Sequence, residues 1–504
     1  MKRQIATKVT AAITLAAMAM SAVGCGSTDA PAPEAPATDA PATTDAPAAE
    51  PAAEPAAEPA AEPAAEPAEE EGPYTVIKDA DGNPIDLGGM EIIIRDWWSD
   101  PEGIAPEPTN DYEEAVADYR DWIQETYNFT IKQQGISDWG STPEDFANYV
   151  TGGDQGENYI WVLRPDATGS ALGSGLMYDL STLDCLDFSL PKFQNNKVAE
   201  NYTIGGGTYA MYAGYSEPRT GIYFNKRVLT EAGIDPESIY DMQADGTWTW
   251  QAWDDMMAQV QRDTDNDGQI DVWGLTLNEG SMTSVAVAAN GGAFIGSGAE
   301  GFTYELENQK TLDALDWTVD IFTKYDQHDP EGANWDYYKE EFQSGTVAFL
   351  VEDAYEGYEN GIVDQMDDEC GFVMFPAPTE GAAYVNVWNN NPIAIPACYD
   401  ADKAWKLAFA WNLYTEAPAG YEDYNGQFAT FRKGCFDERA VDETLTMMME
   451  SEHGVIQYHG LVPNLQIGPD LVWSVTPNAD VSALVEAIRD TWKQYIEDAN
   501  AAFN

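Results

Sequence analysis

Acidic side chains occupy alternate positions between residues 263 and 267, and this spacing could bind a metal ion. The oxygen ligands would fill loop positions one, three, five, seven and nine, which are Asp263, Asp265, Asp267, the carbonyl of Gln269, and Asp271. A glycine at position six permits the sharp turn of a calcium loop. Hard oxygen donors at this spacing suit calcium better than zinc.

Position twelve of this loop departs from the helix-loop-helix calcium pattern. A bidentate glutamate is expected there, but the residue is Gly274 and a strand pattern surrounds it. We therefore expect a structural calcium site whose last ligand comes from elsewhere in the chain. The alternative is an acidic surface turn without an ion.

Catalytic motifs are weak or missing in the sequence. Residues 296–301 match the glycine pattern of dinucleotide-binding loops, but residues 302–306 resemble a strand, so no helix N-terminus follows to meet a phosphate. The sequence contains neither a P-loop nor a nucleophile elbow. The histidines, His328, His453 and His459, lack zinc-binding spacing.

Adjacent carboxylates, such as Glu352 and Asp353, are the remaining candidates for catalysis. Glycoside hydrolysis needs two carboxyl groups on either side of one bond. Adjacent acids are common in a chain with 87 acidic residues, so they give that reaction little support. We expect a binding protein that is not an enzyme. A surface-anchored glycoside hydrolase and a glycan adhesin are the alternatives.

Strand and helix patterns alternate along the chain, which predicts an α/β fold. Strands are expected at 91–95, 159–163, 209–215, 221–225 and 273–277. Helices are expected at 112–127, 250–262, 311–325, 403–414 and 481–503. Strands separated by helices predict largely parallel sheets, and ligands bind at the carboxyl ends of such strands.

Length and charge narrow the function further. The segment 73–504 is longer than one hydrophobic core usually serves, so we expect two lobes. A formal net charge of −63 argues against nucleic acid and anionic lipid as partners. Four cysteines follow residue 25 at wide spacings that match no metal pattern, and their disulfide pairing stays open.

The N-terminus has the pattern of an exported protein. Three basic residues precede an apolar run at 9–23, which is too short to span a membrane but typical of a signal peptide. The small residues before Cys25 resemble a bacterial lipobox, in which the cysteine is acylated, for example with palmitate. We expect residues 1–24 to be removed and Cys25 to anchor the protein to a membrane.

Residues 25–72 are expected to form a disordered tether. Proline recurs at every fourth position from Pro47 to Pro67, which excludes a helix, and the charged residues are all acidic. An extended chain of about 3.1 Å per residue would reach roughly 145 Å. The protein would then be displayed at the outer face of the cytoplasmic membrane.

Seven segments occur in an order that resembles the extracellular solute-binding lipoproteins of bacterial ABC importers, in particular the sugar-binding, maltodextrin-binding-protein-like family. They are Gly221-Ile-Tyr-Phe-Asn-Lys226, Ala232-Gly-Ile-Asp235, Thr247-Trp-Thr-Trp250, Asn290-Gly-Gly292, Glu307-Asn-Gln-Lys-Thr311, Phe342-Gln-Ser-Gly-Thr-Val-Ala-Phe349 and Ala401-Asp-Lys-Ala-Trp-Lys-Leu-Ala-Phe409.

The resemblance implies a two-lobed periplasmic-binding-protein-like fold of type II, with a ligand cleft between lobes joined by a hinge that the chain crosses several times. One lobe is expected at 73–213 plus 377–425, and the other at 214–376 plus 426–504. Ligand would stabilise the closed form, which a permease of an ABC transporter recognises. We expect the protein to act as a monomer.

Sugars present flat apolar faces and a rim of hydroxyls, so aromatic, carboxylate, amide and guanidinium groups should line the cleft. The expected ligand-binding residues lie at strand ends and in loops: Trp97, Trp98, Asp100, Arg164, Asp166, Tyr215, Arg219, Trp335, Asp353, Tyr355, Trp388 and Asn389. Because neighbours in an extended chain point in opposite directions, only one of Trp97 and Trp98 is expected to face the ligand.

The charge of the ligand depends on three arginines near predicted strand ends, Arg95, Arg164 and Arg219. If each pairs with a nearby carboxylate, such as Asp96 or Asp166, the cleft would suit a neutral oligosaccharide. If they are unpaired, an acidic sugar would fit. We expect the neutral ligand.

Overall fold

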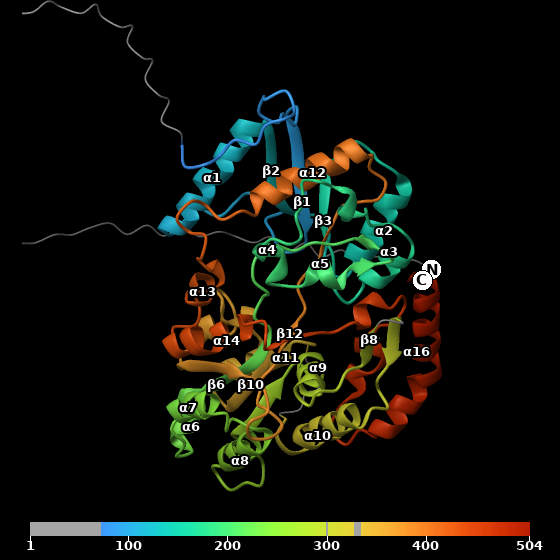
Figure 1. Ribbon diagram of the computed structural model, residues 1–504. Coiled ribbons are helices and arrows are strands. Elements are labelled where there is room, and N and C mark those ends of the chain that lie inside the picture. Colours follow the sequence, from blue (N-terminus) through green and yellow to red (C-terminus); the bar gives the residue numbers. More distant parts are fainter. Residues whose placement is uncertain (1–71, 299–300, 327–333, 504) are drawn as a thin grey trace, which may run out of the picture. The chain divides into compact units, whose positions relative to one another are not determined.

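The computed structural model describes residues 72–298, 301–326 and 334–503 (Figure 1). The predicted signal peptide, Cys25, the predicted tether up to residue 71, and His328 lie outside the described residues. Within the described part of the chain, no helix combines the length and the apolar character that a membrane span requires.

The first sheet has the strand order β13-β3-β1-β2. Its strands are β1 (Met90–Asp96), β2 (Phe129–Gly135), β3 (Tyr159–Val162) and β13 (Ile393–Ala394). Strand β1 runs parallel to both β2 and β3, whereas β13 is antiparallel to β3. Helices α1 (Asp111–Tyr127) and α12 (Ala401–Tyr414) contact each other and β2 (Figure 1), and bury Ile123 and Phe409 in a core with Ile92 and Ile94.

The second sheet has the order β11-β6-β10-β7. Its strands are β6 (Thr220–Asn225), β7 (Trp273–Leu277), β10 (Val347–Asp353) and β11 (Cys370–Met374). Helices α8 (Trp250–Val260), α9 (Glu279–Ala289) and α11 (Tyr337–Gln343) contact β10. Five apolar residues in a row at the start of β10 are fully buried, as expected for a central strand.

The expectation of largely parallel sheets is wrong for this second sheet. Strand β10 is parallel to β7, but β6 is antiparallel to both β10 and β11. The reason is that β6 enters directly from the segment joining the two sheets, rather than through a helical crossover. The expected strand at 209–215 is also wrong, because this segment makes only an isolated bridge between Met211 and Ile393.

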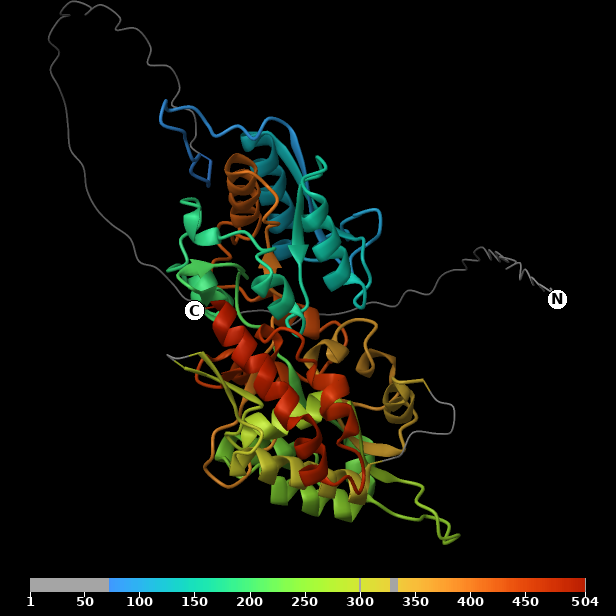
Figure 2. The same cartoon turned by 90° about the vertical axis from the view of Figure 1, so that its right-hand side faces the viewer.

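The remaining helices and strands complete the described fold. The helices are α2 (Thr142–Gly152), α3 (Thr168–Gly173), α4 (Pro191–Gln194), α5 (Val198–Asn201), α6 (Lys226–Glu231), α7 (Glu237–Asp245), α10 (Gln309–Tyr325), α13 (Gly426–Phe431), α14 (Thr446–Met449), α15 (Ile467–Asp470) and α16 (Val481–Phe503). The strands are β4 (Thr203–Ile204), β5 (Gly207–Thr208), β8 (Ile295–Gly298), β9 (Gly301–Tyr304), β12 (Asn386–Trp388) and β14 (Gly454–Ile456). Helix α16, red in Figure 2, contacts β9, α10 and α3.

Strands β8 and β9 pair as an antiparallel hairpin, so the glycine pattern at 296–301 leads into a strand as expected.

The connecting segments between the sheets are tied together by buried amides. The chain passes from the first sheet into β6, and it returns through β12, which pairs in parallel with β14. Asn386 is fully buried: its Oδ1 accepts a bond from the Arg219 amide at 3.1 Å, and its Nδ2 donates to the Met448 carbonyl at 2.9 Å. Asn390 Oδ1 accepts a bond from the Glu217 amide at 2.9 Å. The exact boundaries of the lobes stay a prediction.

Strand β10 ends in two acids, Glu352 and Asp353, and Glu352 is buried in the protein interior. Glu352 is 1% exposed, and its Oε1 accepts a bond from the Asp353 amide. Burial, followed by repulsion from Asp353, raises the pKa of Glu352. The folded protein therefore holds a proton on Glu352 at pH values where the unfolded chain has lost it.

We predict that this proton makes stability depend on pH. As the pH rises above 4.5, the ordinary glutamate pKa, the unfolded chain releases the proton first, so the free energy of unfolding falls. The fall is about 1.4 kcal/mol per pH unit until the folded pKa is reached. Glu352→Gln should remove this component. The difference in the free energy of unfolding between the variant and the wild type should therefore shift in favour of the variant from pH 5 to pH 8, as measured by urea unfolding at both pH values.

Glu359→Gln is the matched control for this variant, because Glu359 is an exposed carboxylate a few residues along the same segment. It should keep the pH dependence of the wild type. Identical pH profiles for Glu352→Gln and the wild type would show that Glu352 ionises normally in the folded protein.

Candidate functional site

A cavity of about 990 Å³ is lined by residues from the segments around both sheets. From the first sheet come the residues after β1 and β3, and from the second come the residues that flank β6 and follow β10. The lining includes the side chains of Trp97, Trp98, Trp139, Asp166, Glu217, Arg219, Asp353, Tyr355, Glu356, Tyr358, Asn389, His459 and Trp473. The cavity thus combines aromatic surface with many polar groups.

The aromatic residues of the cavity expose large parts of their rings. Trp98 is 54% exposed, and Trp139, Tyr355 and Trp473 are likewise among the exposed large hydrophobic residues. Such rings offer flat apolar faces on which a ligand could stack. Exposure of this much aromatic surface within one cavity is unusual unless a ligand covers it.

Both Trp97 and Trp98 line the cavity, although only one of them was expected to. Strand β1 ends at Asp96, and the chain then turns, because Asp96 Oδ1 accepts bonds from the backbone amides of Trp98 and Ser99. The alternation of an extended strand therefore stops before the tryptophans. Their ring centroids lie 4.9 Å apart with the planes at 83°.

Arg219 is the cation in the described lining of the cavity, and it is paired with acids. Its guanidinium lies 2.8 Å from Glu217 and 3.6 Å from Asp353, and it donates a bond to the Asn389 carbonyl at 2.9 Å. Burial lowers the pKa of Arg219, but Glu217 and Asp353 outweigh burial, and the net shift is upward. Arg219 is therefore charged, and its charge is balanced within the cavity wall.

The other two arginines at the predicted strand ends are also paired. Arg164 forms a two-point ion pair with Asp166, and its guanidinium carbon lies 3.3 Å from the centre of the Trp139 ring. Arg95 pairs with Asp145 at 3.5 Å, rather than with Asp96. All three arginines are therefore paired with carboxylates, which is the first of the two cases considered from the sequence.

Two acids of the cavity wall, Asp353 and Glu356, are held by partners within the protein. Glu356 is 5% exposed and pairs with Lys339, and its Oε2 accepts a bond from the Ile362 amide. Asp353 accepts a bond from the Thr220 hydroxyl at 2.7 Å. Burial raises the pKa of Asp353, and Arg219 opposes this shift. These carboxylates are held in place by partners rather than free to rotate.

Seven of the twelve predicted ligand-binding residues line this cavity: Trp97, Trp98, Asp166, Arg219, Asp353, Tyr355 and Asn389. Five do not. Asp100, Tyr215 and Trp335 are exposed at other places, Arg164 lines a separate pocket, and Trp388 lines a smaller pocket beside the cavity.

Sequence reasoning missed Trp139, Glu217, His459 and Trp473, which also line the cavity. Trp139 lies in a turn that no strand pattern marks, and His459 and Trp473 each lie in a single turn of 3₁₀ helix. Glu217 could have been found, because it lies two residues before Arg219 in the same hinge segment.

The predicted calcium loop brings three of its acids together. One carboxylate oxygen from each of Asp263, Asp265 and Asp267 lies within 4.8 Å of the others. Gly268 has a φ of 92°, and its amide donates to Asp263 Oδ2, which forms the tight turn. Asp271 is engaged differently, because its Oδ2 accepts bonds from the amide and hydroxyl of Thr264.

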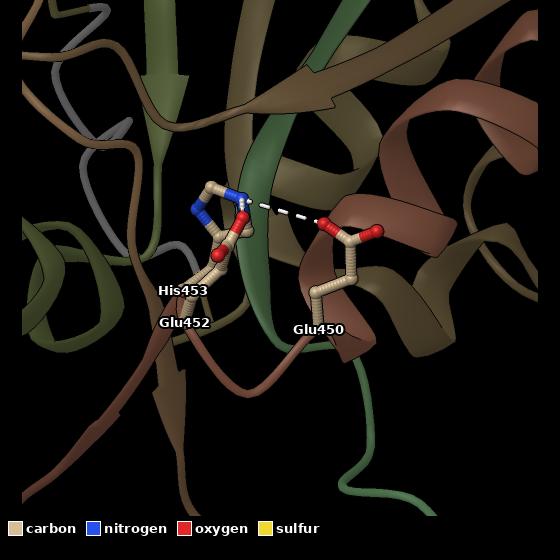
Figure 3. Close-up of side chains that lie close together, drawn as sticks. All are labelled: Glu450, Glu452 and His453. Atoms are coloured by element: carbon tan, nitrogen blue, oxygen red, sulfur yellow. Dashed lines mark ion pairs between the residues drawn. The ribbon is translucent and has the colours of Figure 1, made fainter.

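A second group that could hold a cation consists of Glu450, Glu452 and His453 (Figure 3). His453 Nε2 lies 3.6 Å from Glu450 and 3.8 Å from Glu452, whereas Nδ1 lies 2.8 Å from the Tyr384 carbonyl. The carbonyl can only accept, so Nδ1 carries the proton and Nε2 faces the carboxylates.

Solved structures with a similar fold are solute-binding proteins. UgpB from Mycobacterium tuberculosis in complex with glycerophosphocholine has a TM-score of 0.55 and 16% identity, over 81% of this chain and 98% of that one. The cyclic α-maltosyl-1,6-maltose binding protein from Arthrobacter globiformis has a TM-score of 0.53 and 15% identity, over 82% and 99%. A Streptococcus pneumoniae solute-binding protein in complex with the blood group A-trisaccharide has a TM-score of 0.51 and 17% identity, over 80% and 99%. These similarities confirm the expected α/β, two-lobed fold of type II.

No curated protein sequence is significantly similar to this chain. The sequence profile of one family, described as bacterial extracellular solute-binding protein, matches residues 105–415, which is more than half of the chain. The matched range contains three of the four strands of the first sheet, all four strands of the second, and the acidic residues of the cavity lining. The chain therefore belongs to the family of bacterial extracellular solute-binding proteins.

Proposed function

We propose that the cavity binds a neutral oligosaccharide. The observation that carries this proposal is the set of exposed tryptophan and tyrosine rings next to carboxylate, amide and guanidinium groups in one cavity. Stacking faces and a dense set of hydrogen-bonding groups are what a sugar ring requires. The pairing of Arg219 with Glu217 and Asp353 supports a neutral ligand, because no unpaired cation in the described lining is left for an acidic one.

Ligands of the similar structures give further support. The Arthrobacter protein is a cyclic α-maltosyl-1,6-maltose binding protein, and the Streptococcus protein was solved with the blood group A-trisaccharide. UgpB was solved with glycerophosphocholine, which is not an oligosaccharide. An acidic sugar or another small solute is therefore the alternative ligand within the same role.

Binding in this cavity would be coupled to closure of the two lobes. The lining of the cavity comes from segments around both sheets. A ligand would therefore make contacts in the closed form that the open form does not offer. Because of this difference in contacts, the ligand would shift the equilibrium towards the closed form. The closed monomer would then deliver the sugar to the permease of an ABC transporter. The buried acids are held by Arg219, Thr220 and Lys339, which suits binding rather than hydrolysis.

We predict that a thermal-shift screen and calorimetry will find saturable, one-to-one binding of a neutral oligosaccharide without any product. Trp98→Ala removes an exposed stacking face and should cost about 1.4 kcal/mol, a tenfold rise in Kd. Trp335→Ala is the control, because Trp335 is 76% exposed and does not line the cavity.

Different failures of this screen have different meanings. Release of monosaccharide would identify an enzyme, and binding of uronates alone would identify an acidic ligand. Equal loss of affinity in both tryptophan variants, or no binding of any soluble glycan, would place the ligand outside this cavity or outside the carbohydrates.

We propose that the protein is a lipoprotein anchored through Cys25. The basic residues, the short apolar run and the small residues before Cys25 support this, as does membership of an extracellular family. In cells of a bacterium that processes lipoproteins, the wild type should partition into the detergent phase, and Cys25→Ser should partition into the aqueous phase. Recovery of both proteins in the same phase would contradict the anchor.

We propose that the loop at 263–271 binds calcium. Asp263, Asp265 and Asp267 supply carboxylate oxygens that lie close together, and their hard donor chemistry suits this ion. Asp271 would contribute indirectly, by holding Thr264 through two hydrogen bonds. When bound, the ion would balance charge repulsion and stiffen the turn before β7.

We predict that chelation lowers the melting temperature of the wild type by a few degrees, because an ion at 100 times its Kd adds about 2.7 kcal/mol of stability. The double variant D263N/D267N should melt at the same temperature with and without chelator. The double variant E450Q/E452Q alters the His453 group and should respond like the wild type. Equilibrium dialysis without bound calcium in the wild type would end this proposal.

A further inference from the structure

A further pocket, with a volume of about 380 Å³, adjoins the cavity at the first sheet. Trp98, Glu217 and Asn391 line both spaces, so a ligand in the cavity could continue into this pocket. The volume lies within the range of roughly 300–1,000 Å³ that is usual for pockets that bind small molecules. The pocket therefore has room for an additional unit of the ligand.

The first sheet supplies part of the pocket wall. Ile94, Gln133 and Val162 line it from β1, β2 and β3, and each lies at or near the carboxyl end of its strand. These strands are parallel, and ligands of α/β sheets bind at this end. Helix α1 adds Arg120, and the end of α12 adds Tyr414. The pocket thus has the position of a ligand site, and its described lining contains one cation, Arg120.

Arg120 differs from the other arginines of the protein in having no acidic partner. Every other arginine in the described part of the chain forms an ion pair with a carboxylate. Arg120 forms none with any described residue, although the sequence contains 87 acidic residues, and its guanidinium carbon lies 3.7 Å from the centre of the Tyr414 ring. A partly buried charge without a counter-ion is costly. Arg120 therefore indicates an anionic group that comes from outside the protein.

A ligand can reach the guanidinium of Arg120 through its terminal nitrogens. Nε is buried without a hydrogen-bond partner, so a ligand cannot touch it. The two terminal nitrogens have no hydrogen bond to any described residue either, but they are not among the buried atoms that lack a partner, so they are accessible. The guanidinium lies against Tyr414, which lines the same pocket. A group bound in the pocket could therefore pair with these nitrogens.

The chemistry of a guanidinium selects the kind of group. Its planar fork can donate two parallel hydrogen bonds to the two oxygens of a carboxylate. An ammonium would be repelled, and an apolar group would cover the charge without pairing with it. A phosphate would bring up to two negative charges to one guanidinium. A carboxylate, with its single charge, is the best match for Arg120.

The one acid in the described lining of this pocket is already paired. Glu217 Oε2 lies 2.8 Å from Arg219, and Glu217 Oε1 accepts a bond from the Tyr212 hydroxyl at 3.1 Å. Glu217 is therefore not available to Arg120. The unpaired charge in the described lining is that of Arg120.

Aromatic rings indicate what carries the carboxylate. Trp98, Tyr212, Trp411 and Tyr414 all line the pocket. Such rings pack against the apolar faces of sugar rings, whereas a small free anion would leave them uncovered. A hexuronate combines a sugar ring with one carboxylate attached to it, so it satisfies both the rings and the cation.

We propose that this pocket binds a hexuronate unit of the ligand, with its carboxylate on Arg120. The proposal rests on the proposed binding of a neutral oligosaccharide in the cavity, and it adds one acidic unit attached to that oligosaccharide. The neutral units contact the cavity wall, where Arg219 is paired with acids, and the acidic unit contacts the pocket, where Arg120 is unpaired.

The test uses D-glucuronate as the smallest probe of the pocket, and compares it by calorimetry with its neutral methyl ester and with D-glucose 6-phosphate. The wild type should bind glucuronate about tenfold or more tightly than the ester, because a charge-assisted pair with Arg120 is lost in the ester. Added salt should weaken the binding of glucuronate more than that of the ester. Arg120→Gln should remove the preference for glucuronate. Arg120→Lys keeps the charge without the fork and should bind glucuronate more tightly than Arg120→Gln does.

Lys132→Gln is the matched control, because it removes the same charge from an exposed position on β2 that does not line the pocket. It should keep the preference of the wild type, and melting curves confirm that each variant is folded. Equal affinity of the wild type for glucuronate and its ester, a preference that survives in Arg120→Gln, or tighter binding of glucose 6-phosphate than of glucuronate would overturn the proposal.

Failure of this pocket and failure of the proposed function give different results. If the wild type binds a neutral oligosaccharide but not glucuronate, the pocket for the acidic unit is overturned and the cavity is not. If the wild type binds neither, the proposed function fails as well. The neutral oligosaccharide should bind to Arg120→Gln with the affinity that it has for the wild type, because its units lie in the cavity.

Discussion

The buried amide of Asn386 is the interaction on which the arrangement of the site depends. Segments that run between two sheets leave backbone groups that neither sheet can pair, and such groups are costly when buried. The side chain of Asn386 accepts a hydrogen bond from the Arg219 backbone amide and donates one to the Met448 carbonyl. The backbone amide of Asn386 donates to the His453 carbonyl. Three stretches of chain, far apart in sequence, are thereby held at one point. Arg219 enters the cavity wall from that point.

Charge within the cavity follows from this placement. Because Arg219 is fixed between Glu217 and Asp353, one guanidinium balances two acids in a wall that would otherwise carry only negative charge. Arg164 does the same for Asp166 and also supports the Trp139 ring. Both arginines are thus paired with acids, and neither is left free to bind an anion. This pairing is the basis for the proposed neutral, hydroxyl-rich solute.

Local patterns in the sequence determined the elements. The apolar run of β6, the helix at 481–503 and the acidic turn at 263–267 depend on neighbours in the chain, and the structure has them where they were expected. Only the tertiary structure decided how β6 pairs, that Trp139, His459 and Trp473 join the cavity, and that Tyr215 and Trp335 lie outside it. The physical reason is that strand pairing and loop position are set by contacts across hundreds of residues, and periodicity along the chain carries no record of those contacts.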